Sequence, residues 1–142
     1  MPPRSTNVFA IKAQVQDPLA EKFVFMAQPT MYGGKQILEG DTIFLFASET
    51  QGGHGLFARG IVTSVESVAK RPDVERQAPR VSITVKPTAL AKAPLGRLEV
   101  KSFKNWQDGQ PQTEINFKFY RQATNKIVGI TAGTAAFLNR LF

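Results

Sequence analysis

The sequence predicts an α+β domain that is mostly β, with about five or six strands and two or three short helices. Two observations carry this prediction: apolar and polar residues alternate over several short segments, and glycine or proline clusters separate those segments. The chain has 142 residues and shows no internal repeat, which favours a single domain. We expect that domain to span residues 7–142, after a disordered N-terminal tail at residues 1–6.

The first two segments after the tail are predicted to be a strand and a helix. Residues 7–15 alternate between apolar and polar side chains, as a strand does. Asp17 and Pro18 then match the N-cap and the first turn of a helix that would end before Pro29. The run 23–25 also fits a strand, so both structures stay open there.

Two strands joined by a glycine-rich loop are predicted in the middle of the chain. Residues 42–47 are apolar on both faces, which is typical of a central strand that is covered on both sides. Residues 48–55 form the loop, and residues 56–65 form the next strand. Gly60 inside that strand predicts a bulge or a bend.

The second half is predicted to hold further strands and a C-terminal helix. Residues 80–86 alternate as a half-buried strand does, and residues 87–96 form an irregular stretch with two prolines and several alanines. Alternation over 115–120 predicts another strand or extended segment. Residues 126–130 lead into Thr131, the expected N-cap of a short amphipathic helix.

The positive charge is concentrated in the second half of the chain. The net charge is +7, but residues 1–79 hold 8 Lys/Arg and 8 Asp/Glu, whereas residues 80–126 hold 9 Lys/Arg and 3 Asp/Glu. This asymmetry favours a surface that faces a polyanion such as nucleic acid. A solvated basic face that keeps the protein soluble explains the same counts, so both interpretations stay open.

The side chains that most catalytic and metal sites need are scarce. The chain has no Cys and a single His, His54, which lies in the glycine-rich loop. Ser48 and His54 are the candidate pair for a weak hydrolase, but such a site also needs a carboxylate that orients the His. A zinc site would have to use mostly carboxylates. We therefore expect a protein that is not an enzyme and that needs no metal and no cofactor.

Membrane and export signals are not expected either. The longest apolar runs fall far short of the ~20 residues of a transmembrane helix. The first residues lack the apolar segment of a signal peptide. A soluble, cytoplasmic protein is the expectation.

Aromatic and amide side chains near basic residues offer recognition chemistry instead. Trp106 lies in a polar stretch, where it could stack on a base or cover one end of the core. Tyr120 opens a polar run in which Arg121 could contact a phosphate. The amides of Gln122 and Asn125 could pair with a base edge. An ordinary turn with a salt-bridged Arg explains this run equally well.

Several segments, taken in order, carry a resemblance to a known family. Residues 40–48 are an apolar strand opened by Gly-Asp, and residues 55–62 are a later strand with an inner glycine. Residues 7–14 precede them, and Arg121-Gln122 and the segment 130–141 follow. In this order the segments resemble the PUA-like superfamily, and within it the EVE domain, a relative of the YTH and ASCH domains.

The resemblance implies a small, partly open, mixed β-barrel with helices over its openings. It also implies a reader of modified bases in DNA or RNA, with a pocket at the end of the opening strand and beside the end of residues 42–47. The expected pocket residues are Phe9, Phe46, Ser48, Trp106, Tyr120, Arg121, Gln122 and Asn125. The expected phosphate contacts are Arg80, Lys86, Arg97, Lys101, Lys104, Lys118 and Lys126.

One departure from the family pattern concerns the aromatic cage. Members of the family commonly carry Trp where this chain has Phe9 and Phe46. A cage built on Phe, a cage that uses Trp106, and the loss of modified-base binding all stay open.

The hypothesis from the sequence is a non-catalytic domain that binds nucleic acid. It would recognise a modified or unpaired base in an aromatic pocket flanked by basic residues. DNA or RNA is the expected partner, and a partner nuclease or modification enzyme is left open. The alternative is a module that binds a small, nucleotide-like ligand or a protein on the same barrel.

Overall fold

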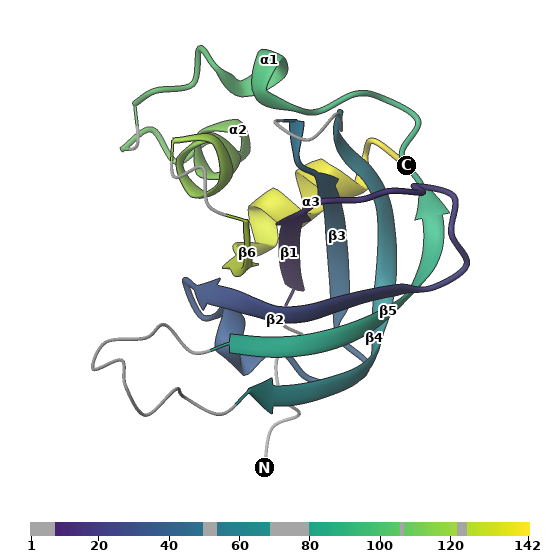
Figure 1. The fold of residues 1–142 in the computed structure, drawn as a ribbon. Coiled ribbons are helices and arrows are strands. Elements are labelled where there is room, and N and C mark those ends of the chain that lie inside the picture. Colours follow the sequence, from purple (N-terminus) through teal and green to yellow (C-terminus); the bar gives the residue numbers. More distant parts are fainter. Residues whose placement is uncertain (1–7, 50–53, 69–79, 106, 122–124) are drawn as a thin grey trace.

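Within the described residues, six strands close into a β-barrel, and the helices of the second half of the chain gather over one side of it (Figure 1). The computed structural model describes residues 8–49, 54–68, 80–105, 107–121 and 125–142. The strands are β1 (Val8–Ala13), β2 (Phe23–Met31), β3 (Thr42–Ala47), β4 (Gly55–Val68), β5 (Arg80–Leu90) and β6 (Lys126–Ile130). The helices are η1 (Gly34–Gln36), α1 (Arg97–Val100), α2 (Pro111–Ile115), η3 (Asn116–Tyr120) and α3 (Ala132–Asn139). The expected fold class is confirmed, but the barrel is closed, not partly open as expected.

The order of the strands makes the barrel mixed. The strands follow one another as β1-β3-β4-β5-β2-β6 around the barrel. β1 runs parallel to β3 and antiparallel to β6, so the end of β1 meets the end of β3 and the start of β6. The register pairs Lys12 with Phe46 on one side and with Lys126 on the other. This meeting point positions the candidate site.

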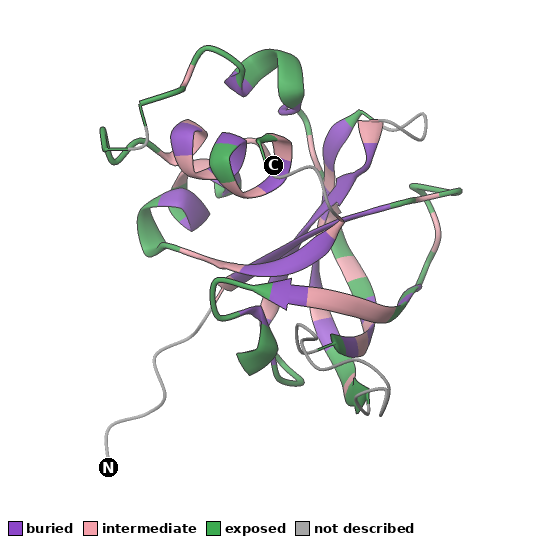
Figure 2. Cartoon of the chain, turned by 60° about the vertical axis from the view of Figure 1, so that its left-hand side comes forward, coloured by how far each residue is buried: buried purple, intermediate pink, exposed green. Residues whose placement is uncertain are grey.

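Two hydrophobic cores flank the wall that β1 and β3 form. The core inside the barrel includes Phe9, Ile11, Ile43 and Leu45. The core between the wall and the helices includes Ala10, Phe44, Phe46, Phe119 and Leu138. Successive residues of a strand point to opposite faces, which explains why residues 42–47 are apolar on both. Figure 2 shows buried residues along the strands and on the helix sides that face them.

The helix predicted after Asp17 is wrong, and the alternative strand is correct. Asp17 caps only a turn, in which its side chain accepts a hydrogen bond from the Leu19 N–H at 3.0 Å. Phe23 and Phe25 then alternate into the barrel core and pair with β5. Cross-strand pairing and burial of both rings outweigh the local helix signal.

The strand predicted over residues 115–120 is also wrong, because these residues are helical. α2 ends at Ile115 and continues directly into η3, a turn of π-helix. Ile115 and Phe119 are both fully buried, whereas Phe117 is 38% exposed. Positions four residues apart share one helix face, so the same apolar residues satisfy a helical pattern.

Other expected elements are confirmed. The pairing register of β4 shifts between Arg59 and Gly60, as the glycine predicts. Thr131 caps α3, because its hydroxyl oxygen accepts a hydrogen bond from the Thr134 N–H at 3.2 Å. One expectation in this region is wrong, because residues 87–90, expected to be irregular, continue β5 as far as Leu90 and pair with β4. The expected tail at residues 1–6 lies outside the described residues.

In the parts of the chain that the structure describes, no helix is long and apolar enough to cross a membrane.

Candidate functional site

Three strand ends and one helix end meet at the predicted pocket. Lys12 near the end of β1 lies between Phe46 of β3 and Lys126 at the start of β6. Ser48 follows β3, and its backbone N–H donates to the Ala13 carbonyl at 2.9 Å. Tyr120 ends η3 above this rim, where its ring faces the Lys12 ammonium. The expected convergence of the opening strand, the end of β3 and the segment from residue 120 is therefore present.

Two buried lysines form the centre of this region. Lys12 is 4% exposed and Lys126 is 1% exposed. The Lys12 Nζ donates to the Phe119 carbonyl at 2.6 Å and lies 5.5 Å from the centre of the Tyr120 ring. The Lys126 Nζ lies 5.9 Å from the centre of the Phe119 ring. We call Lys12, Lys126 and Tyr120, with Glu49 and Arg97 beside them, the lysine cluster.

Burial makes the protonated forms of the two lysines in this cluster energetically unfavourable. Burial lowers the pKa of Lys126 to about 8, and the neighbouring charge of Lys12 acts in the same direction. Burial also lowers the pKa of Lys12, although the nearby Glu49 carboxylate opposes this shift and Arg97 adds to it. Ionisable groups with such perturbed pKa values concentrate at functional sites. The lysine cluster is therefore the candidate site.

The Tyr120 hydroxyl adds a further hydrogen-bond donor. This oxygen is buried, and among the described residues it meets no hydrogen-bond partner. Burial, followed by the charges of Glu49 and Glu99, raises the pKa of Tyr120, so the phenol keeps its proton. Buried polar groups normally have a partner. A neutral hydroxyl beside two ammonium groups suits a ligand that presents acceptor oxygens or ring nitrogens.

The segment around α1 holds the rim of the cluster. The Glu49 Oε1 accepts a hydrogen bond from the Arg97 N–H at 2.8 Å. The Glu99 Oε1 accepts one from the Gly96 N–H at 2.6 Å. A Cβ at Gly96 would displace the Glu49 carboxylate from its present position, so glycine permits this close approach. Arg97 thereby lies close enough to Lys12 and Tyr120 for its charge to act on both.

The expected pocket residues differ in what they can offer a ligand. Phe46 is 1% exposed and packs on Phe119, with ring centres 5.0 Å apart. Phe9 is buried inside the barrel. Ser48 is buried, Asn125 is half-buried beside Lys126, and Arg121 is exposed. Trp106 and Gln122 lie outside the described residues. Base contact by any of these eight residues stays a prediction.

The expected phosphate contacts fall into two groups. The exposed group is Arg80, Lys86, Arg97, Lys101 and Lys104. Lys118 is instead committed within the fold, because its Nζ donates to the Glu114 carboxylate at 2.6 Å and to the Gly129 carbonyl at 2.7 Å. Lys126 lies in the lysine cluster and not on the surface. Only the exposed group can meet a phosphate backbone without rearrangement.

Lys12 is the functional candidate that the sequence did not single out. It shares a strand face with Val8 and Ala10, while Phe9 and Ile11 occupy the opposite face. A strand that is apolar on both faces buries any charge it carries. That pattern was the available signal for Lys12.

The hydrolase alternative and a metal site gain no support from the described residues. Ser48 is buried, whereas His54 is exposed. Within the described ranges, no group of three or more His, Cys, Asp or Glu side chains could hold a metal ion.

Comparison with known proteins identifies the fold. No family model matches the sequence, and no curated protein matches it. The structure of human THYN1 protein in complex with 5-methylcytosine-containing DNA is similar, with a TM-score of 0.63 and 13% identity over 95% of this chain and 96% of that one. The chain has the PUA-like fold of this protein.

Two further structures agree. The DUF55 domain of human thymocyte nuclear protein 1 has a TM-score of 0.62 and 12% identity, over 94% of this chain and 96% of that one. A hypothetical protein from Leishmania major has a TM-score of 0.62 and 13% identity, over 96% and 94%. The expected PUA-like fold is thus confirmed. Identities this low establish the fold alone.

Proposed function

We propose that this PUA-like domain binds nucleic acid without catalysing a reaction, and that it holds a modified or unpaired base at the lysine cluster. The observation that carries the proposal is the buried pair of Lys12 and Lys126 beside the unsatisfied Tyr120 hydroxyl. All three groups are hydrogen-bond donors, and nucleotides are rich in acceptors on both the base and the phosphate.

The exposed basic residues supply the second part of the interaction. Arg97 lies at the rim of the lysine cluster, and Lys101 follows directly after α1. They could contact phosphates on either side of a base that enters the cluster. The fold shared with a human protein whose structure contains 5-methylcytosine DNA supports the same function.

Binding of labelled oligonucleotides to the wild type and to Lys12→Met tests the proposal. A hydrogen bond to a charged group contributes about 1.5–3 kcal/mol, so we expect Lys12→Met to lower affinity by about tenfold or more. Methionine keeps the length of the buried chain but loses the hydrogen bond to the Phe119 carbonyl, so denaturant unfolding of the variant must accompany the binding measurement. Lys92→Met, at an exposed lysine outside the cluster, serves as the control and should change affinity little.

The choice of oligonucleotides separates the parts of the proposal. Strands with cytosine, with 5-methylcytosine and with a scrambled sequence should be compared as single strands and as duplexes. Equal affinity for all of them would contradict base recognition and leave general nucleic-acid binding intact. No measurable affinity for any of them would contradict the whole proposal.

A second candidate function is the binding of a free nucleotide-like ligand. The burial of the cluster favours it, because Lys12 and Lys126 are 4% and 1% exposed and a free nucleotide needs a smaller opening than a nucleic-acid strand. Nucleoside monophosphates that bind more tightly than the matching oligonucleotides would support this candidate over the first.

A further inference from the structure

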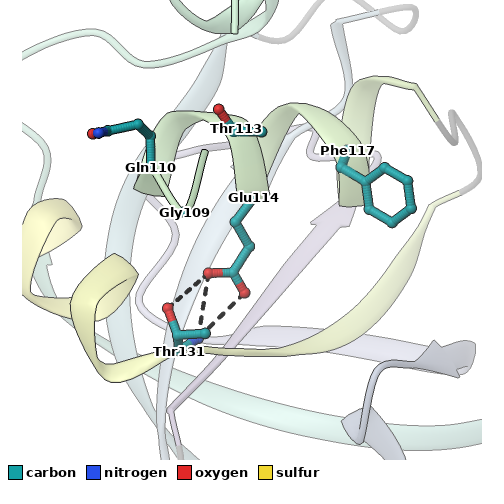
Figure 3. A pocket seen from close by; sticks show the side chains of 6 residues that line it. All are labelled: Gly109, Gln110, Thr113, Glu114, Phe117 and Thr131. Carbon is teal, nitrogen blue, oxygen red and sulfur yellow. Dashed lines mark hydrogen bonds between the residues drawn. The ribbon is translucent and has the colours of Figure 1, made fainter. Parts of the chain in front are cut away.

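A second surface lies at the opposite end of β1 and β6 from the lysine cluster. Two hollows meet there at Thr131. One, of about 270 Å³, lies between α2 and the start of α3 and is lined by Gln110, Thr113, Glu114 and Phe117 (Figure 3). The other, of about 300 Å³, is lined by Val8, Tyr32, Gln36 and Lys118. We call the two hollows together the aromatic groove.

Two half-exposed rings form the rim of the aromatic groove. Tyr32, which follows β2, and Phe117 of η3 are each 38% exposed, with ring centres 6.0 Å apart. The Lys118 Nζ lies 5.0 Å from the centre of the Tyr32 ring. Ring faces with a cation at their edge are the parts from which base-stacking surfaces are built.

The backbone at Tyr32 is held in an unfavourable conformation. Tyr32 has φ +52°, in the left-handed region that bulky residues seldom adopt. Its carbonyl accepts a hydrogen bond from the Gly129 N–H at 3.1 Å, and a Cβ at Gly129 would lie 2.6 Å from that carbonyl oxygen. The contact with β6 thus fixes the strained turn. Strain that presents a half-exposed ring is a feature of ligand-binding positions.

The floor of the aromatic groove carries balanced charge. The Glu114 carboxylate accepts hydrogen bonds from the Thr131 hydroxyl at 2.8 Å and from Lys118 at 2.6 Å (Figure 3 shows the contact with Thr131). Burial alone would raise the pKa of Glu114, but hydrogen bonds from Lys118, Thr134 and Thr131 outweigh it and hold the pKa below its ordinary value. Glu114 therefore stays negatively charged, and a negative charge repels phosphate.

The chemistry of the groove therefore differs from that of the lysine cluster. The groove presents ring faces, and its lining also carries side-chain amides, a carboxylate and the hydroxyls of Thr113 and Thr131, which hydrogen-bond to Asp108 and Glu114. Donors and acceptors occur together, and a nucleobase also combines a flat face with donors and acceptors on its edge.

We infer that the aromatic groove stacks a nucleobase that neighbours the nucleotide held at the lysine cluster, an inference that rests on the proposed function. Val8 lines the groove and Lys12 lies in the cluster, four residues further along β1, or about 13 Å at the rise of a strand. A single strand of nucleic acid could reach both. An aromatic or proline-rich peptide is the competing occupant that the experiment addresses.

Two ligands and a ring deletion test the inference. A single-stranded oligonucleotide of about ten nucleotides and a nucleoside monophosphate should each be titrated into the wild type and Phe117→Ala. Loss of stacking should weaken oligonucleotide binding by about five- to 150-fold, while the monophosphate at the lysine cluster binds unchanged. Phe117→Tyr should restore binding. Val24→Ala, a truncation at a 54% exposed position of β2, is the matched control.

The outcomes separate the two proposals. Wild-type binding that Phe117→Ala leaves unchanged would overturn the second site and leave the proposed function standing. Absence of oligonucleotide binding by the wild type would overturn both. A strand with 5-iodouracil should also form photo-crosslinks to Tyr32 or Phe117 in the wild type, without any variant. Crosslinks found only elsewhere would contradict the inference and favour a peptide at this surface.

Discussion

Lys126 illustrates how burial changes the properties of a single residue. Its side chain is 1% exposed, and Lys12 lies beside it on the neighbouring strand. Desolvation and the second positive charge both disfavour its protonated form. The protein therefore loses stability by keeping Lys126 charged, and a gain in function offers the physical reason for keeping it.

We expect Lys126→Met to raise the free energy of unfolding at neutral pH, and the gain to shrink at alkaline pH. The pKa of Lys126 is about 8 in the folded protein, against 10.5 as its ordinary value. Below pH 8 Lys126 is protonated in both the folded and the unfolded state, so the folded wild type bears the full free-energy cost of burying that charge. Between these values the unfolded state binds more protons, so wild-type stability rises with pH. Denaturant unfolding at pH 7 and pH 10 measures the difference.

Lys101→Met is the control for this prediction, because Lys101 is exposed and its replacement should change stability equally at both pH values. The prediction would be contradicted if the free energies of unfolding of the wild type and Lys126→Met differed by the same amount at both pH values. Lys126 would then not be desolvated in the folded protein.

Glycines within the elements decide how closely neighbouring segments approach. Gly60 lies in β4 at a shift in the pairing with β5. A Cβ there would lie 2.7 Å from the Lys86 carbonyl oxygen and 2.6 Å from a methyl carbon of Val85. Gly133 in α3 is different, because a Cβ there meets no atom within 4 Å.

We expect Gly60→Ala and Gly133→Ala to change stability in opposite directions. Overpacking of the barrel wall should make Gly60→Ala less stable by about 1–3 kcal/mol. Alanine in an open helical position should make Gly133→Ala more stable by about 0.4–1 kcal/mol. Thermal or denaturant unfolding of the pair measures both effects. A neutral Gly60→Ala would mean that β4 and β5 can separate at the bulge without cost.

Across the whole molecule, the exposed basic residues are spread widely. Arg80 starts β5, whereas Arg97 and Lys101 lie at the two ends of α1, near the lysine cluster. Arg80 and Leu90 are ten positions apart along β5, or about 33 Å at the rise of a strand. A nucleic-acid strand bound at the lysine cluster therefore meets the α1 region first. Figure 1 shows α1 and the start of β5 on different sides of the barrel.

We expect nucleic-acid affinity to fall steeply with salt, through the residues near α1. Each neutralised phosphate contributes about 0.9 to the slope of log affinity against log salt on duplex DNA. Lys101→Ala should lower the magnitude of that slope by about one. Arg80→Ala should leave it nearly unchanged if the strand stays near α1. Affinities at several salt concentrations give the slopes, and a larger effect of Arg80→Ala would place the strand along β5 instead.

The sequence by itself determined the features that depend on local pattern. Alternation and turn residues were enough for β1, β3, β4 and β5, for the bulge at Gly60 and for the cap at Thr131. The concentration of positive charge in the second half also follows from composition. These features need only residues close together in the chain.

Only the tertiary structure decided the features that depend on distant partners. Phe23 and Phe25 became strand because β5 pairs with them, and residues 115–120 became helix because one face of that segment covers the outer core. Lys12 and Lys126 became neighbours only when β6 closed the barrel beside β1. No local sequence pattern predicts this contact. The pKa shift of Lys126 comes from burial and from the charge of Lys12, which lies more than a hundred residues away in the sequence.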